Sequence, residues 1–224
     1  MKLIFLGDST MQYNDETTYP QVGWPQGLTP YLGKDVQVFN FAKNGRSTKT
    51  FMNMGHFDEA MKVIDENSVV VIEFGHNDGH TYDPERFTTP DEYKVNLRKM
   101  INDCKKKGAK VVLLSPIYRR HFKEDGTIDG MCHAGYHEKA IELAKEDHLD
   151  FIDMTELTKK KLVEEGPEKS KKYFMQFDKG IYPNYPDGMA DNTHLVQKGA
   201  DMIAGLFVEN AKGIESLRGV FNGI

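Results

Sequence analysis

Short apolar runs separated by helical patterns are the feature that most limits how this chain can fold. Residues 3–6, 69–74 and 111–115 are nearly continuous apolar runs, which are typical of strands covered on both faces. Residues 36–41 and 149–153 are two further candidates. Because helical patterns separate these runs, the strands should pair in parallel through right-handed crossovers. The sequence therefore predicts an α/β fold, a flavodoxin-like three-layer sandwich with a five-stranded parallel sheet.

The clearest helix is expected from Thr89 to the stop at Gly108. Thr89 and Glu92 form a capping box around Pro90, and three lysines precede the glycine. Its apolar stripe includes Cys104, which we expect to be a small core residue. Other helices are expected over 57–66, 134–147, 154–165 and 193–211. The long loops at 75–89, 116–133 and 166–192 should leave or approach the carboxyl edge of the sheet, where such loops are often functional.

Composition indicates an ordinary globular chain. Its 224 residues, 39% of them hydrophobic, suit one domain over residues 1–224. The net charge of −5 argues against a nucleic-acid partner, and no run of 18 apolar residues predicts a membrane span. No signal-peptide pattern is seen, so we expect a cytoplasmic protein, or a secreted one if a leader was removed. The oligomeric state is not predicted.

A candidate nucleophile follows the first strand. Ser9 comes two residues after Gly7, and the carboxyl end of a strand is where ligands bind in open α/β sheets. A serine needs an adjacent base. His194 is the best candidate, because Asp191 precedes it by three residues at the expected start of the last helix, where one turn would bring the two side chains together. Alone, this spacing is weak, since an acid near a helix start is favoured by the dipole.

Acyl transfer also requires hydrogen-bond donors directed at the developing oxyanion. The second and third predicted strands are followed by Gly45 and Asn77, at the edge where Ser9 is expected. The backbone N–H groups of Ser9 and Gly45 and the side-chain amide of Asn77 are the candidate donors. Either loop alone is also a common turn sequence.

The four blocks in this order resemble the SGNH (GDSL-type) hydrolase superfamily over residues 3 to about 210. They are Gly7-Asp8-Ser9, Gly45, Gly75-His76-Asn77-Asp78 and Asp191-Asn192-Thr193-His194. The resemblance implies the SGNH hydrolase fold, with Ser9 as the nucleophile, His194 as general base and acid, and Asp191 as the orienting acid. It also implies an oxyanion hole of Ser9, Gly45 and Asn77. Asp8 would be structural, bonding loop backbone beneath the site.

The longer motifs are similar to those of rhamnogalacturonan acetylesterases, which remove O-acetyl groups from the pectin backbone. Thr10 follows the serine where a lipase-like relative more often has leucine, and residues 45–51, 74–79 and 116–126 resemble the same branch. The implied activity is that of a serine esterase on acetylated oligosaccharides. Alternatives are an esterase or thioesterase on other acyl esters (acetylxylan, short-chain lipid or acyl-CoA), or a catalytically inactive carbohydrate-binding relative.

Several residues near the same edge are candidates for substrate contact. The planar guanidinium group of arginine can donate two hydrogen bonds to the carboxylate of galacturonate. Aromatic rings can stack on sugar faces, and a histidine beside the oxyanion loop can line the pocket. The candidates are Arg46, Arg119, Arg120, Trp24 and His76, with Tyr82 as a further aromatic. Basic loop residues are commonly just solvated, and Trp24 could instead pack in the core. No metal-binding or phosphate-binding motif is present, so no cofactor is expected.

Overall fold

The computed structural model describes residues 1–130 and 132–223 and has a parallel five-stranded sheet at its centre. The strand order is β2-β1-β3-β4-β5, the flavodoxin-like order expected from the sequence. The strands are β1 (Lys2–Gly7), β2 (Gln37–Asn40), β3 (Ser68–Glu73), β4 (Lys110–Leu114) and β5 (Asp150–Ile152). The predicted α/β fold with a five-stranded parallel sheet is confirmed.

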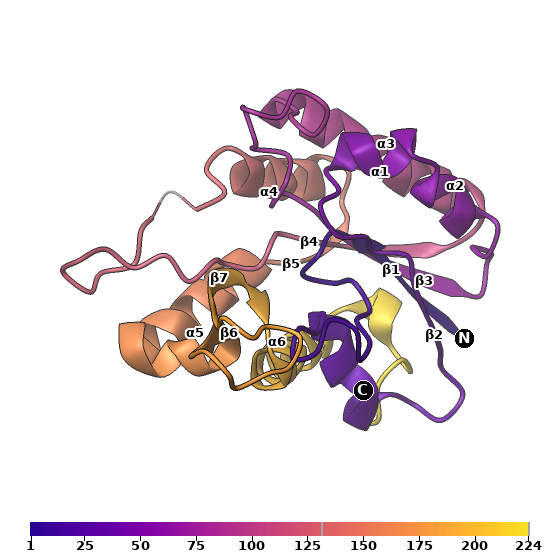
Figure 1. Ribbon diagram of the computed structural model, residues 1–224. Helices are drawn as coiled ribbons and strands as arrows, with labels where there is room; N and C mark the ends of the chain where they lie inside the picture. Colours follow the sequence, from indigo (N-terminus) through magenta and orange to yellow (C-terminus); the bar gives the residue numbers. More distant parts are fainter. Residues whose placement is uncertain (131, 224) are drawn as a thin grey trace.

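Helices cover both faces of this sheet (Figure 1). One face carries α1 (Thr48–Asn53), α2 (His56–Met61), α3 (Pro90–Lys106) and α4 (Tyr136–Glu146), and the other carries α5 (Met154–Lys169), α6 (Gln197–Ala211) and the 3₁₀ helix η1 (Trp24–Tyr31). Successive side chains of a strand point to opposite faces. In β1, accordingly, Leu3 and Phe5 join the core under α5 and α6, whereas Ile4 and Leu6 join the core under α3 and α4.

The capping box predicted for α3 is confirmed. Thr89 Oγ1 accepts the backbone N–H of Glu92 at 3.2 Å, and Glu92 Oε2 accepts the N–H of Thr89 at 2.7 Å. Cys104 is fully buried on this helix, as expected. The C-terminal segment also packs on the sheet, because Leu217, Val220 and Phe221 belong to the core under α6; Ile224, the last residue of that segment, lies outside the described residues.

The main local difference concerns the residues before α6. A helix was expected from residue 193, but residues 189–195 form β7 (Met189–Leu195), which pairs antiparallel with β6 (Phe174–Phe177). Asp191 Oδ1 accepts the backbone N–H groups of Thr193 and His194, at 2.6 and 3.0 Å, and this local turn competes with helix formation. The helix expected at 57–66 is the shorter α2, which ends at Met61, and α1 precedes it as a helix that the sequence did not predict. Gly166 introduces a kink within α5. The short 3₁₀ helices η2 (Ser170–Tyr173) and η3 (Glu215–Leu217) complete the fold.

Candidate active site

Ser9 lies just beyond the carboxyl end of β1, at the point where the order of the sheet reverses. Strands β2 and β3 flank β1 on its two sides, and ligands bind at such switch points. Gly7 ends the strand because a side chain does not fit there: a Cβ atom would lie 2.4 Å from Met11 Sδ and 2.8 Å from the carbonyl oxygen of Glu73. The close packing of β1 on β3 therefore sets where Ser9 leaves the sheet, with 5% of its surface exposed.

Hydrogen bonds join Ser9, His194 and Asp191. His194 Nε2 lies 2.9 Å from Ser9 Oγ, and His194 Nδ1 lies 2.6 Å from Asp191 Oδ2. Burial alone would raise the pKa of Asp191, but the hydrogen bond and charge of His194 and two backbone N–H groups outweigh it and lower the pKa. The carboxylate is therefore ionised at neutral pH and fixes the imidazole so that Nε2 faces the serine.

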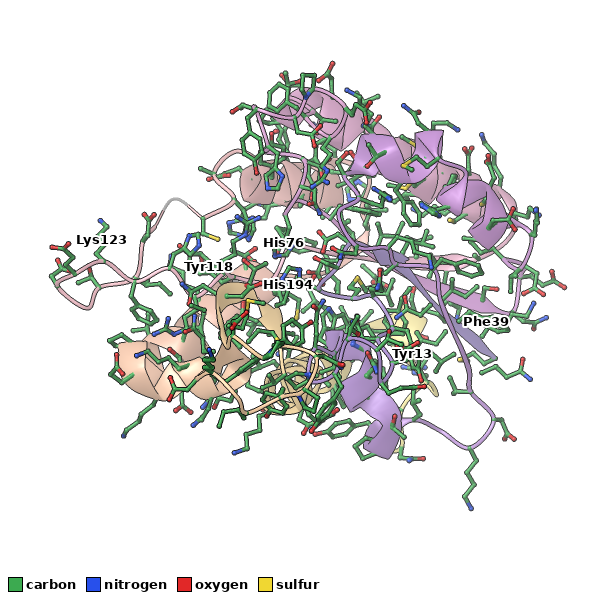
Figure 2. All side chains as sticks on the ribbon, in the orientation of Figure 1. Tyr13, Phe39, His76, Tyr118, Lys123 and His194 are labelled. Atoms are coloured by element: carbon green, nitrogen blue, oxygen red, sulfur yellow. The ribbon has the colours of Figure 1, made fainter. Side chains whose placement is uncertain are left out.

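Figure 2 shows His194 and His76 at the same end of the sheet, where the loops after β1, β2 and β3 gather. The N–H groups of Ser9 and Gly45 donate no hydrogen bond to any described residue. Gly45 adopts a φ of +72°, a backbone conformation that favours glycine. Asn77 is 6% exposed, and its Nδ2 donates to the carbonyl oxygen of Arg46 at 3.1 Å, which leaves its second amide hydrogen for a ligand.

Beneath the serine, Asp8 organises the loop through its carboxylate. Its Oδ1 accepts the N–H and the hydroxyl of Thr10, at 3.0 and 2.9 Å, and its Oδ2 lies 3.0 Å from His76 Nδ1. Burial would raise the pKa of Asp8, but the charge and hydrogen bond of His76, together with Thr10, lower it to about 2. The structural role expected for Asp8 agrees with these contacts.

Glu73 is a second buried acid in this network, and its role was not recognised from the sequence. Its Oε2 accepts the indole N–H of Trp24 at 2.9 Å, and its Oε1 accepts the N–H of Ile117 at 3.2 Å and lies 3.3 Å from Thr10 Oγ1. Burial, followed by the charge of Asp8, raises the pKa of Glu73 to about 8. The signal was present in the sequence, since Glu73 is the one acid in an otherwise apolar strand.

The hydrogen bonds around Thr10 agree with a proton on Glu73. The single hydroxyl hydrogen of Thr10 cannot serve two carboxylates, and the contact with Asp8 is the shorter one. A neutral Glu73 resolves this, because its own O–H donates to Thr10 Oγ1 while Thr10 donates to Asp8. Glu73 thereby ties together the chain after Ser9, helix η1 and the loop after β4.

The expectation that Trp24 stacks on a sugar is wrong. Trp24 is fully buried between Phe5 and Phe207, with ring centroids 5.6 and 5.1 Å away. The indole N–H, the only polar group of the side chain, donates to Glu73. The indole therefore has no face left for a ligand, because helix η1 packs it between the sheet and α6.

His76 and Arg120 are also corrected to structural roles. His76 is 3% exposed, and its two ring nitrogens contact Asp8 and the carbonyl oxygen of Ile117. Arg120 is 8% exposed and donates to Ser170 Oγ, to Asn192 Oδ1 and to the carbonyl oxygen of Pro167. Both side chains are buried and hydrogen-bond to atoms of the neighbouring loops, which explains their structural role.

Arg46 and Arg119 stay candidates for substrate contact. Arg46 lies close enough to α2 to act on His56, whose pKa is lowered by burial and then by the charges of Arg46 and Lys43. Arg119 Nη2 donates to the carbonyl oxygen of His76 at 2.6 Å, beside Asn77, and its remaining nitrogens have no acceptor among the described residues.

No helix in the described part of the chain is long and apolar enough to cross a membrane.

Several known proteins are similar to this chain in sequence and in fold. Rhamnogalacturonan acetylesterase RhgT of Bacillus subtilis is 34% identical over 217 residues, 97% of this chain and 90% of the relative. The probable rhamnogalacturonan acetylesterase YesY of the same organism is 35% identical over 213 residues, 94% of this chain and 91% of the relative.

The crystal structure of the YXIM protein of Bacillus subtilis superposes with a TM-score of 0.77 at 28% identity, over 94% of this chain. This chain spans 56% of that solved chain, little more than half of its length. The GDSL-like Lipase/Acylhydrolase family matches residues 5–201, which include Ser9, Gly45, Asn77, Asp191 and His194. The chain therefore belongs to the GDSL-like lipase/acylhydrolase family and is a carboxylic ester hydrolase.

Proposed function

We propose that this hydrolase is a serine esterase that removes O-acetyl groups from carbohydrate, with acetylated rhamnogalacturonan oligosaccharides as its substrate. The observation that carries the proposal is the chain of hydrogen bonds from Asp191 through His194 to Ser9. The substrate class is supported by the two relatives that are named as rhamnogalacturonan acetylesterases.

In the proposed first step, Ser9 Oγ bonds to the acetyl carbonyl carbon while His194 Nε2 takes the hydroxyl proton. The carbonyl oxygen becomes the oxyanion of a tetrahedral intermediate. The N–H groups of Ser9 and Gly45 and the amide of Asn77 donate to that oxyanion, and they are more effective there than in water because they are already oriented.

The intermediate then collapses. The bond between the former carbonyl carbon and the sugar oxygen breaks, His194 returns the proton to that oxygen, and the acetyl group stays on Ser9. In the second half, water attacks the acetyl carbonyl and gives a proton to His194. The bond between the acetyl carbon and Ser9 Oγ then breaks as His194 returns the proton to Ser9 Oγ, and acetic acid leaves and ionises to acetate in water. Asp191 stays ionised throughout and stabilises the imidazolium that forms twice in the cycle.

The decisive experiment measures acetate release from acetylated rhamnogalacturonan fragments and from acetylated xylan, by the native chain and by Ser9→Ala. The native chain should act on the rhamnogalacturonan fragments at the higher kcat/KM. Ser9→Ala should lose on the order of 10³-fold or more in kcat while its thermal unfolding temperature is unchanged. A folded and active Ser9→Ala protein would contradict the proposed nucleophile.

Two further measurements separate the alternatives. On p-nitrophenyl esters a sugar deacetylase should prefer acetate and lose activity by octanoate, whereas a lipid or acyl-CoA hydrolase should accept longer chains. Labelling of Ser9 by a fluorophosphonate should succeed in an enzyme, and its failure would favour a catalytically inactive carbohydrate-binding protein.

A further inference from the structure

We propose that a subsite for a negatively charged sugar lies beside the oxyanion donors, formed by His80, Tyr82 and Arg86 of the loop after β3 together with Arg119. We call these four residues the uronate subsite. This inference rests on the proposed function and deepens it, because it assigns the carboxylate of an acidic sugar next to the acetylated one to named groups.

Arg86 lies beside Gly45, whose backbone N–H is one proposed oxyanion donor. A Cβ atom on Gly45 would be 3.5 Å from Cζ and from Nη2 of Arg86. Arg86 Nε pairs with Asp83 Oδ2 at 3.0 Å, and its two terminal nitrogens have no acceptor among the described residues. The side chain is 37% exposed. The guanidinium thus keeps unused donors beside Gly45, and the sequence pattern does not indicate this residue.

Arg119 approaches the same place from the loop after β4. It donates to the carbonyl oxygen of His76, the residue before Asn77. His80 lies in the field of both guanidiniums, since burial and then the charges of Arg119 and Arg86 lower its pKa. Asp83 is the one acid among the groups acting on His80, and it is already paired with Arg86. Two arginines with one acid leave a local positive charge in a chain whose net charge is −5.

An aromatic face completes the subsite. Tyr82 stacks on His80, with ring centroids 5.1 Å apart and planes at 21°, and it is 81% exposed. A large exposed aromatic ring beside the guanidinium groups of Arg86 and Arg119 suits a ligand that has both an apolar face and an anionic group. An acidic sugar ring has both, whereas a neutral xylan lacks the anionic group.

The loop that carries the subsite is held at its base. Asp78 Oδ1 accepts hydrogen bonds from Thr48 and Thr88, and Lys49 Nζ donates to the carbonyl oxygens of Pro84 and Phe87, at 2.8 and 3.1 Å. Because these contacts lie within the chain itself and do not need a ligand, little ordering is required on binding. The carboxylate is then received by the terminal nitrogens of Arg86 and Arg119, and the sugar ring packs on Tyr82.

The test compares acetate release from acetylated rhamnogalacturonan fragments with release from the same fragments after methyl esterification of their carboxylates. The quantity measured is the ratio of kcat/KM for the charged and the esterified substrate. In the native chain this ratio should be about tenfold or more, and raising the ionic strength should reduce it. In Arg86→Gln the ratio should fall toward one. Arg86→Lys restores the positive charge without the planar guanidinium group and should recover part of the native ratio.

Arg218→Gln is the matched control, because it removes the same charge from an exposed arginine paired only with Glu215 on η3, and its ratio should equal that of the native chain. Tyr82→Ala should raise KM for both fragments. If Arg86→Gln lowers activity on both substrates by the same factor, the residue is structural and the uronate subsite is disproved. If the native chain releases acetate from both fragments equally, the subsite fails while the esterase function stands. If it releases acetate from neither, the proposed function itself fails.

Discussion

The Nε2 atom of His194 lies 2.9 Å from the Oγ atom of Ser9, although 185 positions separate the two residues in the chain. Ser9 follows the central strand β1, whereas His194 is on β7, outside the main sheet. An isolated bridge between Val22 and Leu195 joins the chain after Ser9 to the residue after His194. The hairpin of β6 and β7 is therefore docked against the loop of the nucleophile, and this docking sets the distance between nucleophile and base.

Asp191→Asn should abolish most of the activity without unfolding the chain. An amide opposite His194 Nδ1 donates where the carboxylate accepts, so the imidazole must carry its proton on Nε2 and can no longer accept the proton of Ser9. We expect kcat to fall on the order of 10³-fold. Steady-state kinetics on p-nitrophenyl acetate measure the loss, and circular dichroism checks the fold. A loss smaller than threefold would exclude Asp191 as the orienting acid.

Asn77→Ala should reduce kcat by about 10²- to 10³-fold with little change in KM, because an oxyanion donor acts mainly in the transition state. Asn44→Ala is the control: Asn44 is exposed, neighbours Gly45, and uses its backbone N–H to contact Gln12. Equal effects of the two substitutions would assign the loss to loop disturbance rather than to a missing donor.

Glu73 should make the stability of the chain depend on pH. Because burial and the charge of Asp8 raise the pKa of Glu73 from 4.5 to about 8, the folded chain holds this proton more tightly than the unfolded chain. Its contribution is complete below pH 4.5 and is lost as the pH rises toward about 8, at a slope of up to about 1.4 kcal/mol per pH unit.

Urea unfolding of the native chain and of Glu73→Gln between pH 5 and 8 tests this slope. The amide cannot reproduce both accepted hydrogen bonds, so Glu73→Gln should be less stable at pH 5. Its free energy of unfolding should nevertheless decline less with pH than that of the native chain. Parallel curves for the two proteins would show that Glu73 does not carry the proton.

Trp24→Phe should cost stability rather than substrate affinity. The substitution removes buried ring volume and the N–H donor to Glu73, which together should lower the free energy of unfolding by about 2–4 kcal/mol. The ratio of kcat/KM for acetylated oligosaccharide to that for p-nitrophenyl acetate should equal the native ratio. A selective loss on the oligosaccharide would restore the stacking role for Trp24 that its burial contradicts.

Local sequence predicted the central strands and α3 because their signals are contained within a few residues. Continuous apolar runs gave β1, β3 and β4, and the capping box at Thr89 gave the start of α3. Dependence on local signals also explains why the sequence predicts the last helix from residue 193, whereas α6 begins at Gln197. An Asp-x-x-His pattern looks the same locally whether it lies at the start of a helix or on a strand. Pairing of β6 with β7, which joins residues 12 to 21 positions apart, decided between the two.

Patterns within the sequence were sufficient to predict the fold class, the candidate serine, and its acid and histidine partners. Side-chain chemistry and strand-end position suffice for these assignments. The packing of distant segments, by contrast, makes Trp24, His76 and Arg120 buried supports, brings Glu73 and Asp8 to the same threonine and places Arg86 beside Gly45. Burial and electrostatic neighbours depend on which distant segments pack together, and that information is not contained in any single stretch of the chain.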